Sequence, residues 1–312
     1  MNFPTTHALY GTGPSARDAD VVLVIEDIVP YMPGDDAPSS HAKVAWVNTD
    51  AVLSRIKTFE MRADRWLACS PASAARAIYD AATALLTQAD MTRIADRRAR
   101  LMERKRLQDA KAEEQAHADA SLPHPTGRLV AYELGKILEP DAVVLNDALS
   151  NGGFVQTYAG RDRTGTYFRS GSSSGGWGSG AAFGIKLTAP ERDVVLASGD
   201  GYFAFGTPLA AIWAASHHKA PFLSVVFVNR SYSTGTTGLR RAYPEGVAVR
   251  AGNYDGGTFD PPPDYAKLAE AGHGYGETVT QTSEVGPALQ RGLDMTRQGT
   301  PAVIAIEVPG PV

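Results

Sequence analysis

Two side chains able to hold a metal ion each stand at the end of an apolar run. Asp200 lies between two glycines shortly after the run 194–196, and Asn229 directly follows the run 222–228. We interpret both runs as buried strands, and open parallel sheets bind ligands beyond the carboxyl ends of their strands. A hard cation takes oxygen ligands and keeps positions for phosphate and water. With the main-chain carbonyl of Ser231, this pattern predicts a Mg²⁺ ion that carries a diphosphate.

The alternative for Gly-Asp-Gly is an ordinary turn, because glycine and aspartate are common turn residues. The full arrangement is more demanding, since it requires a strand, Gly-Asp-Gly, a helix, a second strand and an asparagine in that order. Gly199 and Gly201 also suit a phosphate site. Without a Cβ atom, the backbone at a glycine can approach a ligand closely.

The stretch 199–232 resembles the thiamine-diphosphate motif of the acetolactate synthase and 2-keto acid decarboxylase superfamily. That motif is Gly-Asp-Gly, a spacer in the upper twenties, and a pair of asparagines. Val228 stands at the first asparagine, Asn229 at the second, and Tyr232 matches the aromatic residue that often follows. The positions that bind the metal in the family are therefore kept.

The resemblance implies that the side chains of Asp200 and Asn229 and the carbonyl of Ser231 hold Mg²⁺. It implies that main-chain groups near Gly201 and Tyr202 hold the diphosphate. It assigns no catalytic side chain, because the activating glutamate of the family belongs to a domain that we do not find here. The implied cofactor-binding residues are Asp147, Ser174, Gly175, Gly176, Trp177, Gly199, Asp200, Gly201, Tyr202, Asn229, Ser231 and Tyr232.

The glycine-rich segment 171–184 has no clear strand before it, so it is not a dinucleotide-binding fingerprint. It is either a flexible surface loop or a closely packed turn. In the resembled family this turn carries a large apolar side chain that props the cofactor in a bent form, and Gly175 stands at that position. Trp177 could fill the role, the alignment could be offset by a residue, or the cofactor could be held poorly. Asp147 is either a polar residue near the site or a plain loop aspartate.

Composition excludes several classes of protein. The 312 residues are 43% hydrophobic and 21% charged, with a net charge of −4, which does not favour nucleic acid or a membrane surface as a partner. No apolar run reaches the about 20 residues of a membrane span, and residues 1–12 do not form a signal peptide. The single cysteine, Cys69, excludes an internal disulfide and fits a cytoplasmic protein. We expect Cys69 to be a small buried residue.

The first part of the chain predicts a partial α/β domain over residues 1–90. Strands are expected within 18–26 and at 43–48, and a helix at 71–88. The run 91–118 is dense in charged residues and predicts a solvated helix within a linker, 91–124. Two closely spaced prolines, Pro123 and Pro125, end that helix.

From residue 125 to 312 we expect a single diphosphate- and Mg²⁺-binding domain. Alternating helices and strands predict an α/β fold with a parallel sheet covered on both faces. The expected elements, in order, are helix 126–138, strand 141–146, helix 180–188, a strand ending at 198, helix 206–218, a strand ending at 228, helix 265–272, strand 276–280, helix 284–298 and strand 302–308.

Two further expectations concern this domain. Thr207 should cap the helix 206–218, with Pro208 in its first turn. That helix is apolar nearly all round, so it should be buried on more than one side, either within the domain or in a subunit interface. The segment 233–263 is rich in Gly, Pro, Thr and Asp and predicts a long loop that orders over the diphosphate.

The resemblance implies a thiamine-diphosphate-binding fold preceded by the later half of a central domain. It implies a lyase or transferase that decarboxylates or carboligates 2-keto acids or related acyl donors. The chain matches only the second half of the three-domain family plan, so a partner subunit would supply the pyrimidine-binding domain in a homo- or hetero-oligomer, and the isolated chain would be inactive. Alternatively, the chain comes from a truncated reading frame, or it is a degenerate relative without catalysis.

Two further functions compete with the enzyme subunit. The alternative is a non-catalytic or regulatory cofactor-binding subunit, which the glycine at position 175 favours. A generic nucleotide-binding protein is disfavoured, because the sequence has no phosphate loop of the Gly-x-x-x-x-Gly-Lys kind.

Overall fold

The computed structural model describes residues 5, 7, 9, 10, 16–27, 30, 31, 37–50, 62–170, 174–259 and 261–310. Contacts divide the chain into two compact units, residues 12–104 and residues 105–312 together with 1–11. The boundary falls inside one long helix, α2 (Gln88–Asp119), so the expected limits of a central domain and a linker stay a prediction. No helix within the described ranges is both long and apolar enough to cross a membrane.

The smaller unit contains a three-stranded parallel sheet in the order β1-β2-β3. The strands β1 (Val21–Ile25) and β2 (Lys43–Asn48) confirm the sequence prediction, whereas β3 (Arg65–Ala68) was not predicted. Its core is small, with Val24, Val44 and Trp46 as the buried residues of one cluster. The sheet therefore buries little apolar surface by itself, as expected for so few strands.

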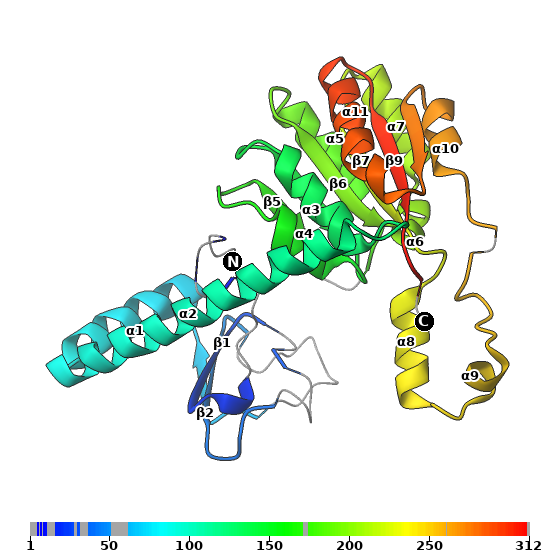
Figure 1. The fold of residues 1–312 in the computed structure, drawn as a ribbon. Helices are drawn as coiled ribbons and strands as arrows, with labels where there is room; N and C mark the ends of the chain where they lie inside the picture. Colours follow the sequence, from blue (N-terminus) through cyan, green and yellow to red (C-terminus); the bar gives the residue numbers. More distant parts are fainter. Residues whose placement is uncertain are drawn as a thin grey trace. The chain divides into compact units, whose positions relative to one another are not determined.

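Two helices follow this sheet along the chain (Figure 1). The helix α1 (Pro71–Leu85) begins with a proline, and its N-cap Ser70 accepts a hydrogen bond from the Ser73 N–H. The helix α2 leaves only Lys105 and Ala116 buried, which confirms the solvated helix predicted from its charges. Cys69 is half-buried, so the expectation of a buried cysteine was wrong.

The larger unit is built on a six-stranded, wholly parallel sheet in the order β5-β4-β6-β7-β9-β8. Buried, mostly branched apolar residues make up its central strands, as is usual for a sheet covered on both faces. The strands are β4 (Val143–Asp147), β5 (Tyr167–Arg169), β6 (Val194–Gly199), β7 (Leu223–Val228), β8 (Tyr275–Val279) and β9 (Ala302–Glu307).

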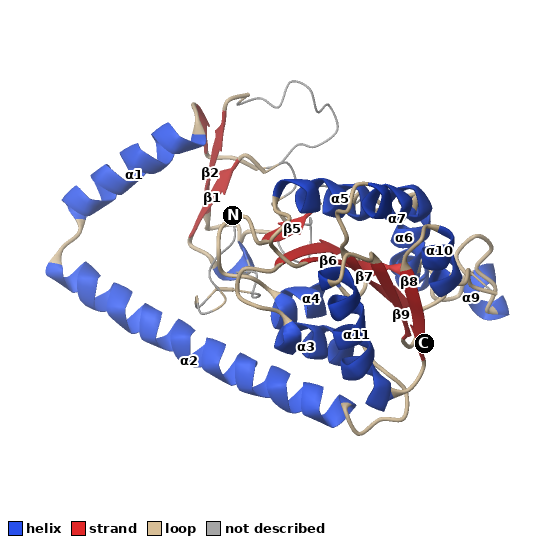
Figure 2. Ribbon diagram, turned by 90° about the horizontal axis from the view of Figure 1, so that it is seen from above, coloured by secondary structure: helices blue, strands red, loops and turns tan. Residues whose placement is uncertain are grey.

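Helices cover both faces of this sheet, which confirms the predicted fold class (Figure 2). One layer packs through a core cluster with α3 (Gly127–Ile137), α4 (Gly152–Ala159) and α11 (Val285–Arg297). The other layer packs through a second cluster with the helices α5 (Gly178–Thr188), α6 (Asp200–Phe205), α7 (Pro208–His217) and α10 (Tyr265–Ala271).

Several local elements differ from the sequence prediction. The helix α4 and the three-residue strand β5 were missed, because both are short and lie in glycine-containing stretches. The segment predicted as a long loop contains α8 (Ser233–Ala242) and α9 (Val247–Ala251). Serine, threonine and glycine dominate the start of α8, and their low helix propensity hid this helix in the sequence.

The helix α7 begins at Pro208, as predicted, but Thr207 does not cap it as expected. Thr207 adopts a left-handed conformation (φ 51°), and its side chain accepts no capping hydrogen bond. Within this chain α7 is not buried on more than one side, because Leu209 and Trp213 are 45% and 52% exposed, so burial of that face in a subunit interface stays a prediction. The buried residues of α7 are Pro208, Ala211, Ile212 and Ala215.

Candidate functional site

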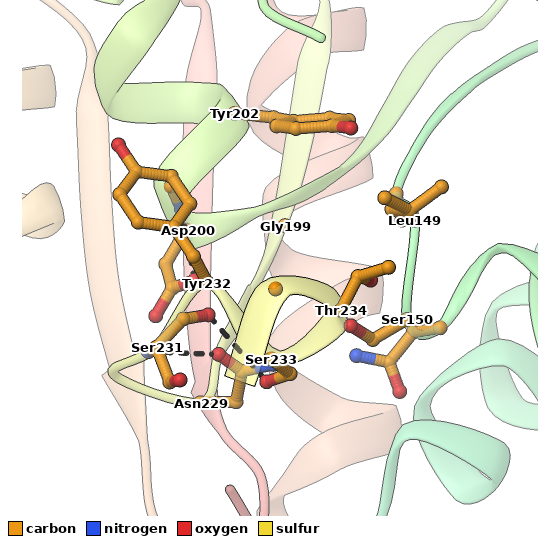
Figure 3. Close-up of a pocket in the computed structure, with 14 residues that line it drawn as sticks. Leu149, Ser150, Gly199, Asp200, Tyr202, Asn229, Ser231, Tyr232, Ser233 and Thr234 are labelled. Atoms are coloured by element: carbon orange, nitrogen blue, oxygen red, sulfur yellow. Dashed lines mark hydrogen bonds between the residues drawn. The ribbon is translucent and has the colours of Figure 1, made fainter. Parts of the chain in front are cut away.

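The neighbouring strands β6 and β7 bring Asp200 and Asn229 to one cavity. In the sheet register Gly199 pairs with Phe227, so Asp200 and Asn229 each lie one or two residues beyond the paired strand ends. Both residues line a cavity of about 270 Å³ at this edge of the sheet. Figure 3 shows their side chains on the same side of the cavity, together with Ser231. The two strand ends therefore meet as the sequence predicted.

Asp200 is a buried carboxylate held by backbone donors. Its side chain is almost inaccessible, with 2% of the residue exposed. Oδ1 accepts a hydrogen bond from the Gly201 N–H (2.8 Å) and Oδ2 accepts one from the Arg230 N–H (2.6 Å). Burial raises the pKa of Asp200 above its ordinary value, while these backbone donors act in the opposite direction. A cation in the cavity would compensate the buried charge.

The Arg230 side chain does not supply that cation. The Arg230 guanidinium forms an ion pair with Glu307 at 2.9 Å, so only its backbone N–H serves Asp200. Arg230 itself adopts a left-handed conformation (φ 58°). Such conformations cost of order 1 kcal/mol in a non-glycine residue and persist where the surroundings fix them. The turn 229–231 is thus held in an uncommon shape at the edge of the cavity.

This turn also orients the other two candidate ligands. Asn229 Oδ1 accepts a hydrogen bond from the Ser231 N–H at 3.0 Å, which fixes the amide oxygen. Ser231 is buried, and its hydroxyl donates to the Gly257 carbonyl at 3.0 Å. One carboxylate, one amide oxygen and one main-chain carbonyl form a set that fits a hard divalent cation. The described residues contain no cluster of three His, Cys, Asp or Glu side chains that would suit a softer metal.

The segment after α9 is tied to the same turn. Ser231 forms an isolated antiparallel bridge with Thr258, and the Phe259 N–H donates to the Arg230 carbonyl at 2.8 Å. The Tyr232 ring contacts the Phe259 ring edge-on, with centroids 4.6 Å apart. A Cβ atom at Gly201 would lie 2.6 Å from the Tyr232 ring, so only glycine fits beneath it.

The predicted site residues fall into three groups. The main cavity is lined by seven of them: Gly199, Asp200, Gly201, Tyr202, Asn229, Ser231 and Tyr232. Asp147 and Ser174 line a smaller cavity, which Tyr202 also borders. Gly175, Gly176 and Trp177 line neither of these two cavities, and Trp177 packs against the core cluster beneath α5, α6 and α7.

The buried carboxylate of Asp147 holds the glycine-rich turn through hydrogen bonds. It is 4% exposed, and Oδ2 accepts hydrogen bonds from the Gly176 N–H (3.0 Å) and the Gly178 N–H (3.1 Å). Burial raises the pKa of Asp147, and the two backbone donors counteract that rise. This geometry shows Asp147 holding the turn, and its contact with a cofactor stays a prediction.

Sequence reasoning missed two segments that line the main cavity. They are the loop after β4 and the start of α8, which contribute Ala148, Leu149, Ser150, Asn151, Ser233, Thr234 and Gly235. The first segment carried a usable signal, since it follows a predicted strand next to β6 in the sheet. The hydroxyls of Ser150, Ser233 and Thr234 add donors that suit an anionic ligand.

Comparison with known proteins shows the family of this chain. Residues 150–306 match the family model of the C-terminal TPP-binding domain of thiamine pyrophosphate enzymes, thiamine pyrophosphate being another name for thiamine diphosphate. The chain belongs to this family of thiamine-diphosphate-dependent enzymes.

Curated relatives are similar over part of their length. Sulfoacetaldehyde acetyltransferase of Castellaniella defragrans is 29% identical over 187 residues, which are 58% of this chain and 29% of that protein. An acetolactate synthase large subunit of Mycobacterium tuberculosis is 30% identical over 179 residues, which are 57% of this chain and 30% of that protein. The match thus spans about a third of the length of these relatives.

Solved structures share the fold over nearly the whole chain. A thiamine diphosphate-dependent 4-hydroxybenzoylformate decarboxylase of Rhodococcus jostii aligns with a TM-score of 0.65 at 17% identity, covering 99% of this chain and 54% of that one. A thiamin diphosphate-dependent enzyme of Mycobacterium smegmatis aligns with a TM-score of 0.64 at 21% identity, with the same coverage. At this identity the likeness concerns the fold.

Proposed function

We propose that this chain is the diphosphate- and Mg²⁺-binding part of a thiamine-diphosphate-dependent enzyme that decarboxylates or carboligates 2-keto acids or related acyl donors. The observation that carries this proposal is the cavity shared by Asp200, Asn229 and Ser231 at the ends of β6 and β7. The Asp200 and Asn229 side chains and the Ser231 carbonyl would hold Mg²⁺. The side of the site near Gly201 and Tyr202 would receive the diphosphate.

When bound, thiamine diphosphate supplies the carbon nucleophile of the reaction. The residues of this chain bind and orient it. The backbone bonds to Asp200 keep the carboxylate in one orientation, and the Ser231 N–H does the same for the Asn229 amide. Leu149 and Tyr202 give the cavity apolar walls that exclude water from the reacting end.

The proposal includes a partner that carries a pyrimidine-binding domain, and an oligomer in the cytoplasm. The match extends over 29% of a curated relative and the chain over 54% of a solved structure, and the resemblance covers only the second half of the three-domain family plan. The exposed Leu209 and Trp213 on α7 favour an interface on that helix. The second candidate function is a non-catalytic or regulatory cofactor-binding subunit, and the glycine at position 175 is the observation that favours it.

Calorimetry with the purified chain tests the cofactor part of this proposal. We expect thiamine diphosphate to bind only when Mg²⁺ is present, because Asp200, Asn229 and Ser231 would hold the cation, whose charge would offset that of the diphosphate. Excess chelator should abolish the heat of binding. A titration that shows no binding with Mg²⁺ present would contradict the proposal.

Turnover measurements separate the enzyme from its alternative. We expect the isolated chain to release no carbon dioxide from 2-keto acids, and a chain that carries a pyrimidine-binding domain to restore turnover when added. Robust decarboxylation by the isolated chain would contradict the requirement for a partner. Cofactor binding without turnover in the presence of that partner would favour the non-catalytic subunit.

Limited proteolysis tests whether residues 233–259 close over the diphosphate. This segment is fixed to the ligand turn by the Ser231–Thr258 bridge, so a ligand that orders the turn should also protect the segment. We expect Mg²⁺ and thiamine diphosphate together to slow trypsin cleavage after Arg240, Arg241 and Arg250 several-fold. Cleavage within α2, which does not line the main cavity, is the internal control. Equal rates with and without ligand would argue against closure.

A further inference from the structure

The Tyr202 ring occupies the space that a side chain at position 175 would fill. A Cβ atom built on Gly175 would lie 2.0 Å from Tyr202 Cδ2, 2.1 Å from Cγ and 2.3 Å from Cε2. Real Cβ contacts do not reach such distances, so no residue with a side chain fits at position 175 while the ring stays in place. Gly175 and Tyr202 are therefore complementary in size.

This ring borders both cavities of the site. Tyr202 lines the main cavity with Gly199, Asp200 and Asn229, and it lines the smaller cavity with Asp147. Figure 3 shows the ring and Leu149 at the end of the cavity opposite Asn229 and Ser231. The Tyr202 ring thus lies at the end of the cavity that is far from Asn229 and Ser231.

The charge and chemistry of the ligand indicate which part of it the Tyr202 ring would contact. A ligand whose diphosphate binds at Asp200 and Asn229 would extend its organic end toward this ring. The organic end of thiamine diphosphate carries a positively charged aromatic ring, and a cation over the face of a tyrosine is attracted by the ring quadrupole.

We propose that Tyr202 is the residue that positions the thiazolium end of the cofactor. Its ring occupies the space in which the resembled family would place a large side chain of the glycine-rich turn. The side chain comes from α6, next to the Gly-Asp-Gly motif, and the turn contributes only the space above Gly175. This inference rests on the proposed function. It also removes the difficulty raised by a glycine at position 175.

The first test compares two ligands by calorimetry in the presence of Mg²⁺, with thiamine diphosphate as the whole cofactor and inorganic diphosphate as its tail. For Tyr202→Ala we expect the Kd of thiamine diphosphate to rise about tenfold, and the Kd of inorganic diphosphate to stay within about twofold. Tyr202→Phe keeps the ring and should bind both ligands within about threefold of the parent chain. An equal loss for both ligands would show a merely structural role and overturn the inference.

The second test measures melting temperatures in a double-mutant cycle. Gly175→Leu should lower the melting temperature strongly in the parent chain, because the new side chain displaces the ring, and much less in the Tyr202→Ala background. We expect the double variant also to bind thiamine diphosphate more tightly than Tyr202→Ala alone, because leucine then fills the vacated space. The same drop in both backgrounds would overturn the size complementarity.

The two tests separate this inference from the proposed function. If the parent chain binds neither ligand with Mg²⁺, the proposed function fails and the ligand part of the inference fails with it. If it binds both ligands and Tyr202→Ala leaves the thiamine diphosphate Kd unchanged, only the assignment of Tyr202 fails.

Discussion

Replacing Asp200 with asparagine is expected to weaken Mg²⁺-dependent binding of thiamine diphosphate at least about 100-fold, or about 2.7 kcal/mol. Asp200 is the charged member of the candidate ligand set, and its burial removes the water that would otherwise screen its charge. Asparagine keeps the size of the side chain and removes the negative charge. Isothermal calorimetry with saturating Mg²⁺ measures the effect, and circular dichroism verifies that the variant remains folded.

The same strand offers a matched control at its other end. Asp193 directly precedes β6, does not line the main cavity, and pairs with Arg297 at 2.7 Å. Asp193→Asn removes the same charge, and loss of a partly exposed ion pair costs at most about 1 kcal/mol of stability. We expect its affinity for thiamine diphosphate to stay within about twofold. An Asp200→Asn variant that binds as tightly as Asp193→Asn would remove Asp200 from the metal site.

Replacing Gly135 with alanine is expected to lower the free energy of unfolding by about 3 kcal/mol. Gly135 lies in α3 where α4 crosses it, and a Cβ atom there would be 2.0 Å from the Tyr158 carbonyl oxygen. The clash is with backbone, so it can be relieved only by separating the helices. Denaturant unfolding followed by circular dichroism measures the loss.

Gly184→Ala is the opposite case and serves as the control. Gly184 lies within α5, and a Cβ atom added there would meet no neighbouring atom within 4 Å. Alanine there should stabilise the chain by up to about 1 kcal/mol, because it favours the helix over the unfolded state. If both substitutions changed the free energy of unfolding in the same direction, the close contact between α3 and α4 would not be what makes Gly135 necessary. Because α4 follows the loop that lines the cavity, Gly135→Ala should also weaken ligand binding.

The sequence was sufficient to predict the strands that carry the candidate site. The runs that end before Asp200 and Asn229 are apolar, branched and short, and such runs form buried strands in any α/β sheet. Since parallel strands expose their carboxyl ends at one edge, the convergence of the two side chains followed from the order of elements. The start of α7 at a proline was also predictable, because the fixed φ of proline suits the first turn of a helix.

Elements with weak local preference could not be predicted in the same way. The helix α4 contains two glycines and a threonine, and its packing against α3 rather than propensity supports it. The helix α8 begins with serine, threonine and glycine, whose low helix propensity gave no helix signal. The left-handed Thr207 is a similar case, because threonine is a favoured capping residue and its type gives no sign of the conformation that it adopts. How much of α7 is exposed depends on which elements pack beside it, and the apolar composition of the helix alone does not determine that.

By itself, the sequence determined the candidate residues for the chemistry, the family to which the motif is similar, and the parallel sheet that holds them. Only the tertiary structure decided that Asp147 holds the glycine-rich turn and that the Tyr202 ring fills the space above Gly175. The physical reason is the range of the interactions. Strand and helix formation depend on neighbours along the chain, whereas packing of a ring against a distant glycine depends on the positions of both elements in space.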